Sequence, residues 1–294
     1  MCKKHLLVIN THNRINEFST LLSHIKSYDQ IFEKIIIICD SDKNYYDLVQ
    51  NCIKKFYEGN KFKIDLIHLN NVGGADARNY IFKNEIFKLY NFLSFCDDDD
   101  IPYLNKFVYA ENYLKKNNDC LAYSCSYFRD YGSFGKKIHF KKKKVFFDNI
   151  LLNNDIGGFS FVTLNTKYLT KNLEIPVNLN SNQDWFLWIK LLFINKKKYF
   201  FKDSYIGLVY NDSRSNDRLT NDLKNIESTF FFYKVCKINF DIEIESVLTY
   251  FYYKIFKNKN LSFFLFYVLF RENTFRFKKR HIKSLLKNYF IKIF

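Results

Sequence analysis

The sequence predicts an α/β protein with a mostly parallel central sheet, and two observations indicate this. Short runs of β-branched and other apolar residues alternate with amphipathic stretches in the amino-terminal third of the chain, which is typical of strands alternating with helices. Polar side chains follow directly after several of these runs, at Thr11, Asp40 and Asp97. Such a sheet binds its ligands at the carboxyl ends of its strands, so we expect these side chains to share one site.

The elements follow from the spacing of apolar residues. Short β-rich runs predict strands, and apolar residues at helical spacing predict the segments between them as helices. Beyond the first four strands the pattern loosens, and residues 132–144 read as a turn followed by a lysine-rich loop. Strands are predicted at residues 5–9, 34–39, 63–69, 92–96, 120–128, 161–164 and 205–210, and helices at 17–27, 46–57, 75–89, 105–116 and 186–193.

Length and composition restrict the class of protein. The chain has 294 residues, of which 48% are hydrophobic, so it can bury a core and is not expected to be disordered. Its 7 cysteines show no Cys-x-x-Cys spacing, which indicates neither a zinc site nor a disulfide framework. The formal net charge of +16 fits an anionic partner, which could be a nucleic acid, a membrane surface or a substrate.

Four consecutive aspartates, Asp97 to Asp100, end the apolar run at 92–96. Adjacent like charges repel one another, so the run is reasonable where a divalent cation or a cation-bound diphosphate lies among them. Mg²⁺ prefers oxygen ligands and usually takes one or two carboxylates together with substrate phosphates. The alternative is a solvated acidic turn that ends at Pro102, because charge runs are often only surface.

Further short motifs accompany the aspartates. Thr-x-Asn-Arg lies at 11–14, Gly-Gly-Ala-Asp-Ala-Arg-Asn at 73–79, and Gln-Asp-Trp at 183–185. In this order and spacing, over residues 4–220, the chain resembles the family 2 glycosyltransferases, which are inverting enzymes of the GT-A fold. The resemblance implies a Rossmann-like sheet flanked by helices. It also implies an enzyme of the hexosyltransferase type that moves a sugar from a nucleotide diphosphate sugar to a hydroxyl, with a UDP-sugar favoured.

The same resemblance implies roles for individual residues. The donor would be held at the carboxyl edge together with Mn²⁺ or Mg²⁺, which neutralises the diphosphate leaving group. Four adjacent aspartates also allow a register shifted by one, with Asp98 and Asp100 as the binding pair. The implied set is Thr11 and Asp40 at the base, Arg14 and Arg78 at the nucleotide, Asp97 at the ribose with Asp98 beside it, Asp99 at the metal, and Asp184 as the catalytic base.

Several of these residues have simpler alternatives. Arg78 could form a structural ion pair with the acidic loop, and Asp184 could only cap the helix that follows it. Trp185 and Trp188 are spaced as core residues of that helix, although they could also line an acceptor pocket. The resemblance further implies that Gly157 and Gly158 lie beside the acceptor, and that a basic residue such as Arg214 or Arg218 faces the diphosphate.

The carboxyl-terminal part of the chain differs in composition. We expect a catalytic domain at 1–220 and a helical, basic and aromatic extension at 221–294. Residues 254–294 hold eleven Lys or Arg and one acidic residue, a net charge of +10. The apolar run 261–270 is too short to span a bilayer, but a helix with Phe263 and Phe264 inserted could lie on an anionic leaflet.

These features predict where the protein acts. The amino-terminal apolar run is too short for a signal peptide. We therefore expect a cytoplasmic enzyme, peripheral on the inner face of the bacterial inner membrane, that extends a glycan or lipid-linked glycan of surface polysaccharide or lipooligosaccharide. The alternative for the extension is a helical cap packed on the first domain.

Three other functions compete with the glycosyltransferase hypothesis. A metal-dependent sugar nucleotidyltransferase also uses carboxylate-bound metal on an α/β sheet, but the amino terminus lacks a glycine-rich, arginine-containing phosphate loop. A basic nucleic-acid-binding protein would explain the net charge, although the aspartates would repel phosphates unless a metal is present. A catalytically inactive relative is not favoured, because Asp97–Asp100 and Asp184 are all retained.

Overall fold

The computed structural model describes residues 5–57, 63–151, 154–179 and 181–211, together with 232, 235, 236, 239 and 240. The chain divides into a unit at 1–232 and a unit at 233–294. In the second unit the described residues are helical, and the Asn239 side chain donates to the carbonyl of Val235 at 2.8 Å. The predicted extension at 221–294, which includes Phe263 and Phe264, therefore lies almost wholly outside the described residues, and so do Arg214 and Arg218 of the predicted catalytic domain. Within those residues, no helix is long and apolar enough to cross a membrane.

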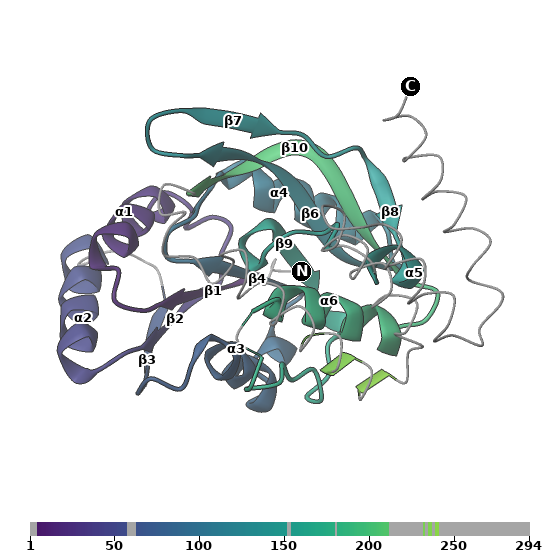
Figure 1. Cartoon of the computed structure of the whole chain (residues 1–294). Coiled ribbons are helices and arrows are strands. Elements are labelled where there is room, and N and C mark those ends of the chain that lie inside the picture. Colours follow the sequence, from purple (N-terminus) through teal and green to yellow (C-terminus); the bar gives the residue numbers. More distant parts are fainter. Residues whose placement is uncertain are drawn as a thin grey trace, which may run out of the picture. The chain divides into compact units, whose positions relative to one another are not determined.

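The described part of the first unit is built on one curled, ten-stranded sheet (Figure 1). Eight strands follow the order β3-β2-β1-β4-β9-β6-β10-β5, while β7 pairs with β6 and β8 pairs with β10. Its first four strands in space are parallel, and β6 and β10 also run parallel to each other, which confirms the predicted mostly parallel sheet. The bounds are β1 His5–Thr11, β2 Lys34–Asp40, β3 Ile64–Leu69, β4 Phe92–Asp97, β5 Ile101–Pro102, β6 Cys120–Asp130, β7 Gly135–Ile138, β8 Lys143–Val145, β9 Val162–Asn165 and β10 Tyr199–Asn211.

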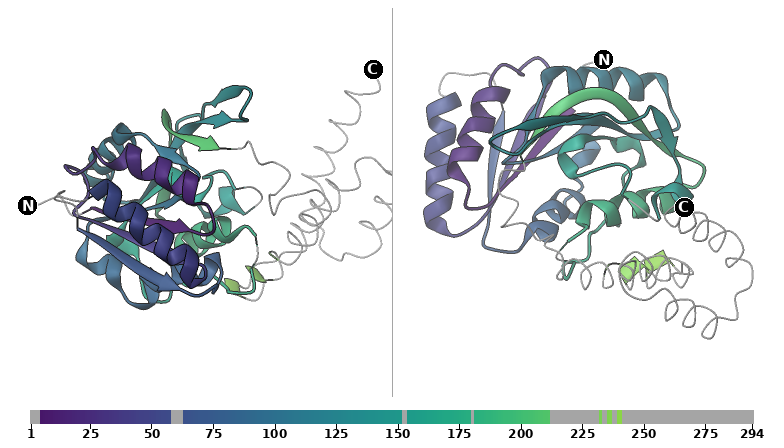
Figure 2. Two further views of the ribbon diagram at one scale, coloured as in Figure 1. Left: turned by 90° about the vertical axis from the view of Figure 1, so that its left-hand side faces the viewer. Right: turned by 45° about the horizontal axis from the view of Figure 1, so that its top comes forward.

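Helices cover both faces of the sheet, as Figures 1 and 2 show. On one face, α1 and α2 lie side by side (Figure 2) and pack on β1 and β2 around a core of aliphatic and aromatic residues that also takes in α4. Phe18, Leu21, Leu22 and Ile25 are buried in α1, which is the spacing of one helix face. The bounds are α1 Ile15–Ile25, α2 Lys43–Tyr57, α3 Gly74–Lys83, α4 Leu104–Lys116, α5 Phe147–Ile150 and α6 Gln183–Ile194, with 3₁₀ helices η1 Ile86–Leu89, η2 Phe159–Phe161 and η3 Thr166–Tyr168.

Two predicted elements are wrong. The helix predicted at 75–89 ends at Lys83, because Glu85 takes a left-handed conformation (φ 51°) that an α-helix cannot contain, and η1 follows. The loop predicted at 132–144 contains β7, which pairs with β6, and β8, which pairs with β10. Both segments are short and rich in lysine, so they lack the apolar alternation that predicts a strand.

The register of the sheet decides which side chains meet at its carboxyl edge. Asn10 lies opposite Asp97 and opposite Ile38, two residues before Asp40. Since alternate residues of a strand face the same side, Asn10, Asp40 and Asp97 share one face of the sheet. Thr11 points to the other face, toward α2.

Candidate functional site

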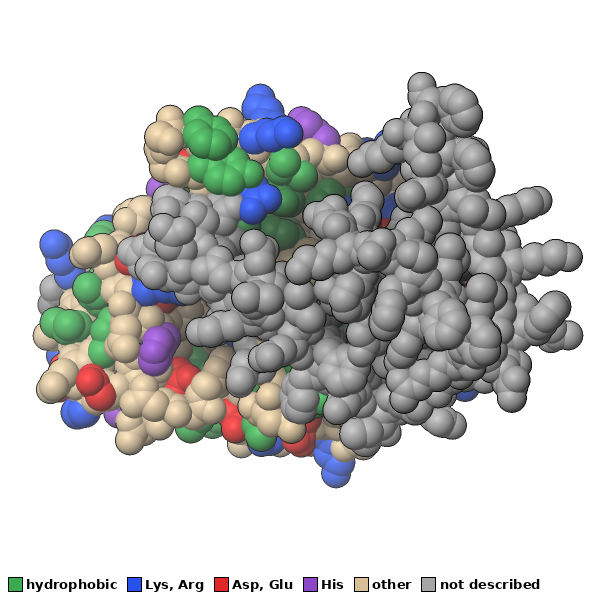
Figure 3. Space-filling model, viewed as in Figure 1, with side chains coloured by type: hydrophobic (Ala, Val, Ile, Leu, Met, Phe, Trp, Pro, Cys, Tyr) green, Lys and Arg blue, Asp and Glu red, His purple; other side chains and the backbone are tan. Residues whose placement is uncertain are grey.

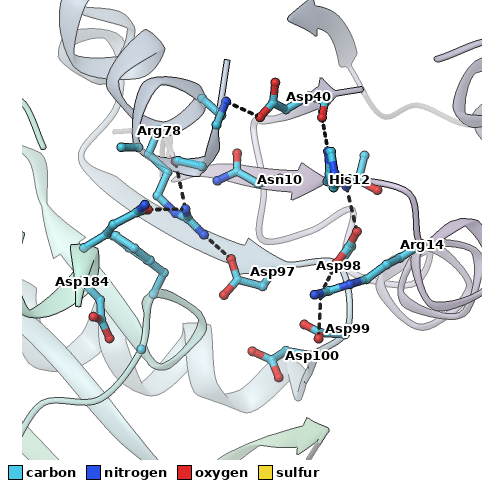
Figure 4. Close-up of a pocket in the computed structure, with 18 of the residues that line it drawn as sticks. Asn10, His12, Arg14, Asp40, Arg78, Asp97, Asp98, Asp99, Asp100 and Asp184 are labelled. Carbon is cyan, nitrogen blue, oxygen red and sulfur yellow. Dashed lines mark hydrogen bonds and ion pairs between the residues drawn. The ribbon is translucent and has the colours of Figure 1, made fainter. Parts of the chain in front are cut away.

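A cavity of about 820 Å³ opens at the carboxyl edge of β1, β2 and β4. It is lined by that edge, the start of α3, the acidic loop after β4, the turn at Gly158 and the start of α6 (Figure 4). This volume is typical of a small-molecule site. All the site residues predicted from the sequence line it, namely Thr11, Arg14, Asp40, Arg78, Asp97, Asp98, Asp99 and Asp184.

Asp40 fixes the loop that leads into α3. Its two carboxylate oxygens accept the backbone N–H groups of Val72 at 2.7 Å and Gly73 at 2.8 Å. Gly73 has a φ of 90°, which favours glycine. A carboxylate oxygen has a second lone pair, so Asp40 retains acceptor capacity toward the cavity. Its predicted contact with a nucleotide base stays a prediction.

Thr11 is buried, and its hydroxyl lies 2.6 Å from the Tyr45 hydroxyl of α2. Its side chain therefore lies on the face of the sheet opposite to Asn10, where it also forms a hydrogen bond with Asp98. The preceding residue, Asn10, faces the cavity between Asp40 and Asp97 (Figure 4). Both polar atoms of the Asn10 amide are buried without a hydrogen-bond partner among the described residues. Sequence reasoning missed Asn10, because only the strand register tells which of the two neighbours faces the ligand edge.

The four aspartates divide into two pairs by exposure. The side chains of Asp97 and Asp99 are 34% and 26% exposed. Asp98 and Asp100 are buried, and burial raises the pKa of Asp98 to about 6 and that of Asp100 well above its usual value. The Asp98 carboxylate accepts the backbone N–H of His12 at 3.1 Å. This exposure pattern favours Asp97 and Asp99, rather than Asp98 and Asp100, as the pair available to a ligand.

Two arginines balance the charge of this loop. One Arg14 nitrogen donates to Asp98 at 3.1 Å and to Asp99 at 2.7 Å. Arg78 donates to Asp97 at 2.6 Å, to the Gly74 carbonyl and to Gln183 of α6. The structural ion pair that was the alternative for Arg78 is therefore present. Through Gln183, the same guanidinium also links the acidic loop to the helix that carries Asp184.

The donor set at this loop fits a divalent cation. Asp97 and Asp99 offer carboxylate oxygens at the cavity, and these are the ligands that Mg²⁺ and Mn²⁺ prefer. No group of three or more potential His, Cys, Asp or Glu ligands is found in the part of the chain that the structure describes. One or two carboxylates can hold such an ion while substrate phosphates complete its coordination. Arg14 would have to release Asp99 for that carboxylate to bind a cation.

Asp184 lies across the cavity from the acidic loop (Figure 4). It is the second residue of α6, and the N-cap position is held by Asn182, so Asp184 is not itself the helix cap. Its Oδ1 accepts the N–H of Trp185 at 2.7 Å, and its Oδ2 accepts an amide N–H of Asn154 at 3.0 Å. Burial raises its pKa to about 6, against the opposing effects of the Trp185 N–H, Arg78 and Asn154.

Trp185 and Trp188 are core residues of α6. Both are buried, and their indole N–H groups donate to the carbonyls of Ile150 and Gly157 at 2.7 and 2.9 Å. Within the described residues neither side chain lines the cavity. Trp185 thus ties α6 to α5, and Trp188 ties it to the turn that faces Asp184.

The two glycines of that turn predict a contrast in stability between their alanine variants. Gly157 has a φ of 96°, and a Cβ there would lie 2.0 Å from the Phe161 ring. We expect Gly157→Ala to lower the free energy of unfolding by about 2–4 kcal/mol, from backbone strain and overpacking. At Gly158 the nearest atom to an added Cβ is Asp184 Oδ2 at 3.9 Å, so Gly158→Ala should fold within about 0.5 kcal/mol of the wild type. Urea titrations of both variants test this, and equal stabilities would contradict it.

An exposed basic surface lies on β7, on β8 and on the segment between them. Lys136, Lys137 and Lys141 to Lys144 are all exposed, and Figure 3 shows Lys and Arg side chains beside hydrophobic ones over the β7 region. Phe134, in the turn before β7, is 64% exposed. Lys142 and Lys143 pair with Asp203 and Asp155. Part of the net positive charge therefore lies outside the carboxyl-terminal segment.

Comparison with known proteins identifies the fold. No family model matches the chain. S. aureus TarS 1–349 in complex with UDP-GlcNAc is 17% identical, with a TM-score of 0.63 over 92% of this chain and 76% of that one. The chain has the fold of GT-A glycosyltransferases. The mannosyltransferase PcManGT of Pyrobaculum calidifontis, in complex with GDP-Man and Mn²⁺, is 11% identical, with a TM-score of 0.53 over 78% of this chain and 62% of that one.

Curated proteins support the same resemblance in sequence. Two proteins named as uncharacterized glycosyltransferases, from Rickettsia conorii and Rickettsia felis, are each 26% identical to this chain over 188 residues. The match covers 63% of this chain but 29% of each relative. The chain thus spans less than a third of the length of the curated relatives it matches. The resemblance to glycosyltransferases inferred from the sequence motifs is confirmed.

Proposed function

We propose that the chain is an inverting, metal-dependent glycosyltransferase that moves a sugar from a nucleotide diphosphate sugar to an acceptor hydroxyl. The observation that carries the proposal is one cavity with two kinds of carboxylate. Asp97 and Asp99 are paired with arginines at the sheet edge, and Asp184 has a raised pKa across the cavity. The carboxylates of Asp97 and Asp99 suit a cation-bound diphosphate, and that of Asp184 suits a general base.

In this mechanism Asp184 takes the proton of the acceptor hydroxyl as its oxygen attacks the anomeric carbon. The new C–O bond forms while the bond to the diphosphate oxygen breaks, so the proton ends on Asp184 and the electron pair leaves with the diphosphate. Attack from the side opposite the leaving group inverts the configuration. A divalent cation held by Asp99 would supply neutralisation of the leaving group. Arg14 would bind the nucleotide, and Arg78 would hold Asp97 for the ribose.

The donor and the acceptor are proposed as classes of molecule. TarS and PcManGT were solved with UDP-GlcNAc and with GDP-Man and Mn²⁺ respectively, and we favour a UDP-sugar here. Asp40 and Asn10 are the residues we expect at the base and ribose. The acceptor would be a glycan or lipid-linked glycan of surface polysaccharide or lipooligosaccharide. Peripheral membrane binding through 221–294 also stays a proposal, which liposome flotation with and without the residues after Phe240 would test.

A thermal-shift screen tests the donor class. The protein is heated with UDP-, GDP-, CMP- and dTDP-sugars, each with Mn²⁺, with Mg²⁺ and with EDTA. The proposal expects stabilisation by at least one nucleotide sugar in the presence of metal, and a smaller shift in EDTA. The absence of any shift with every nucleotide would contradict it, and a metal-independent shift would remove the metal from the mechanism.

The raised pKa of Asp184 predicts how turnover depends on pH. A general base must be ionised to accept a proton, and burial raises this pKa to about 6. We therefore expect kcat/KM to be constant above about pH 7 and to fall about tenfold per pH unit well below pH 6. Initial rates of nucleotide release between pH 4.5 and 8.5 check this. A flat profile down to pH 5 would contradict the role of Asp184.

A further inference from the structure

The turn at residues 154–157 brings one amide side chain against the proposed base. Asn154 Nδ2 donates to Asp184 Oδ2 at 3.0 Å. Its other amide atom, Oδ1, accepts the backbone N–H groups of Ile156 at 3.3 Å and Gly157 at 3.1 Å. Two backbone donors on Oδ1 fix which way the amide points, so the N–H group has to face Asp184.

Two hydrogen bonds, one from the sheet and one from α6, anchor this turn. Ser124 of β6 donates to the Ile156 carbonyl at 2.6 Å, and the Trp188 indole of α6 donates to the Gly157 carbonyl at 2.9 Å. Asn154 is therefore held by the sheet and by the helix that carries Asp184. A donor positioned in this way restricts the rotation of the carboxylate it contacts.

We propose that Asn154 is the positioning residue for Asp184, which orients its Oδ2 toward the acceptor hydroxyl and favours its ionised form. This inference rests on the proposed function of Asp184 as the base. The Trp185 N–H occupies Oδ1, so the Asn154 N–H leaves one lone pair of Oδ2 to receive the proton. A hydrogen bond to the charged form of a carboxyl lowers its pKa, so Asn154 opposes the effect of burial.

Two other charged groups, Arg78 and Asp97, also influence the ionisation of Asp184. Arg78 of α3 favours the ionised carboxylate, and Asp97 of β4 disfavours it. Neither touches Asn154 in the described contacts, so replacing Asn154 leaves both in place. The pKa of Asp184 then reports on the amide alone, provided that the turn is retained.

The test measures that pKa directly, without a substrate. The 294-residue chain is labelled with ¹³C at the aspartate carboxyls and titrated by NMR without metal. The Asp184 signal is identified by its loss in Asp184→Asn. In Asn154→Ala we expect the pKa of Asp184 to rise by about 0.5–1 unit, because the donor is lost. In Asn154→Asp one carboxyl of the new pair should titrate higher still, because like charges repel.

Ser124→Ala is the matched control. It removes one of the two anchors of the same turn, while the Trp188 anchor and the two N–H groups on Asn154 Oδ1 still hold the amide against Asp184. It should therefore leave the pKa of Asp184 unchanged. Asn154→Asp keeps two acceptor oxygens for the Ile156 and Gly157 N–H groups, so it preserves the turn if Asn154→Ala does not fold. Unchanged Asp184 titration in the Asn154 variants, or an equal shift in Ser124→Ala, would overturn the proposal.

A kinetic arm separates this proposal from the proposed function. Where the wild type releases nucleotide from its donor, the acid limb of kcat/KM in Asn154→Ala should move to higher pH by the shift seen in NMR, with donor KM within about twofold. A limb that stays in place would overturn the positioning role while leaving the transferase intact. A wild type that turns over no donor contradicts the function instead, and the NMR titration still decides the contact.

Discussion

Asp184→Asn is expected to lower the turnover number about 10³-fold while the affinity for the donor stays within about twofold of the wild type. An asparagine keeps the size of the side chain and can still accept the Trp185 N–H, but it cannot take a proton from the acceptor. General-base catalysis is worth about 10²–10⁴ in rate. Steady-state kinetics together with calorimetric donor titration measure both quantities.

The same variant carries its own control for folding. The pKa of Asp184 is raised in the folded protein, so ionising this carboxyl costs folding stability, increasingly from about pH 4 to about pH 6 and fully above that. Asparagine removes this cost, but it also places an amide N–H against the Asn154 N–H in place of an accepting oxygen. These effects oppose each other, so Asp184→Asn should fold and melt close to the wild type at pH 7.5. Asp148→Asn, at an exposed position of α5, should change neither melting nor turnover. Retained turnover in Asp184→Asn would refute the base assignment.

Asp99→Asn is expected to weaken metal-dependent donor binding by about 10²-fold. The variant replaces an anionic oxygen ligand with a neutral amide, and hard divalent cations bind carboxylates more strongly. Asp99 also accepts from Arg14 at 2.7 Å, so the variant changes the charge balance of the loop. Calorimetric titration of the donor with Mn²⁺ and with EDTA separates these two effects, because only the metal contribution disappears in EDTA.

Asp65→Asn is the matched control for Asp99→Asn. Asp65 is an exposed aspartate of β3 that pairs with Lys34 and lies outside the cavity. Its replacement should leave the difference between Mn²⁺ and EDTA unchanged. If Asp99→Asn also keeps that difference, the metal is held elsewhere or takes no part in donor binding.

The sequence predicted the sheet and the location of its site better than the contacts within that site. Apolar runs followed by Asp40 and Asp97 are local features, and the rule that ligands bind at strand carboxyl ends connects them. The face of a strand is not local information: Thr11 and Asn10 are neighbours, and only the register shows that Asn10 faces Asp97. Asn154 could not have been found, because its partner Asp184 lies thirty residues away and the contact depends on the turn between them.

The boundaries of several elements also depended on tertiary structure. The lysines of β7 and β8 form strands because β6 and β10 offer free edges to pair with, which overrides a weak local preference. Glu85 prevents α3 from continuing through its left-handed backbone, a conformation that the sequence of residues 75–89 does not predict. Composition alone predicted neither the strands β7 and β8 nor the end of α3.

The measurement that tests the account most directly is the release of nucleoside diphosphate from the donor that stabilises the protein. It is followed with Mn²⁺ at pH 7.5 in the wild type, Asp99→Asn and Asp184→Asn, alongside donor affinity for each. The account predicts turnover in the wild type, weak donor binding with little turnover in Asp99→Asn, and normal binding with about 10³-fold slower turnover in Asp184→Asn. Turnover by Asp184→Asn at the wild-type rate would contradict it.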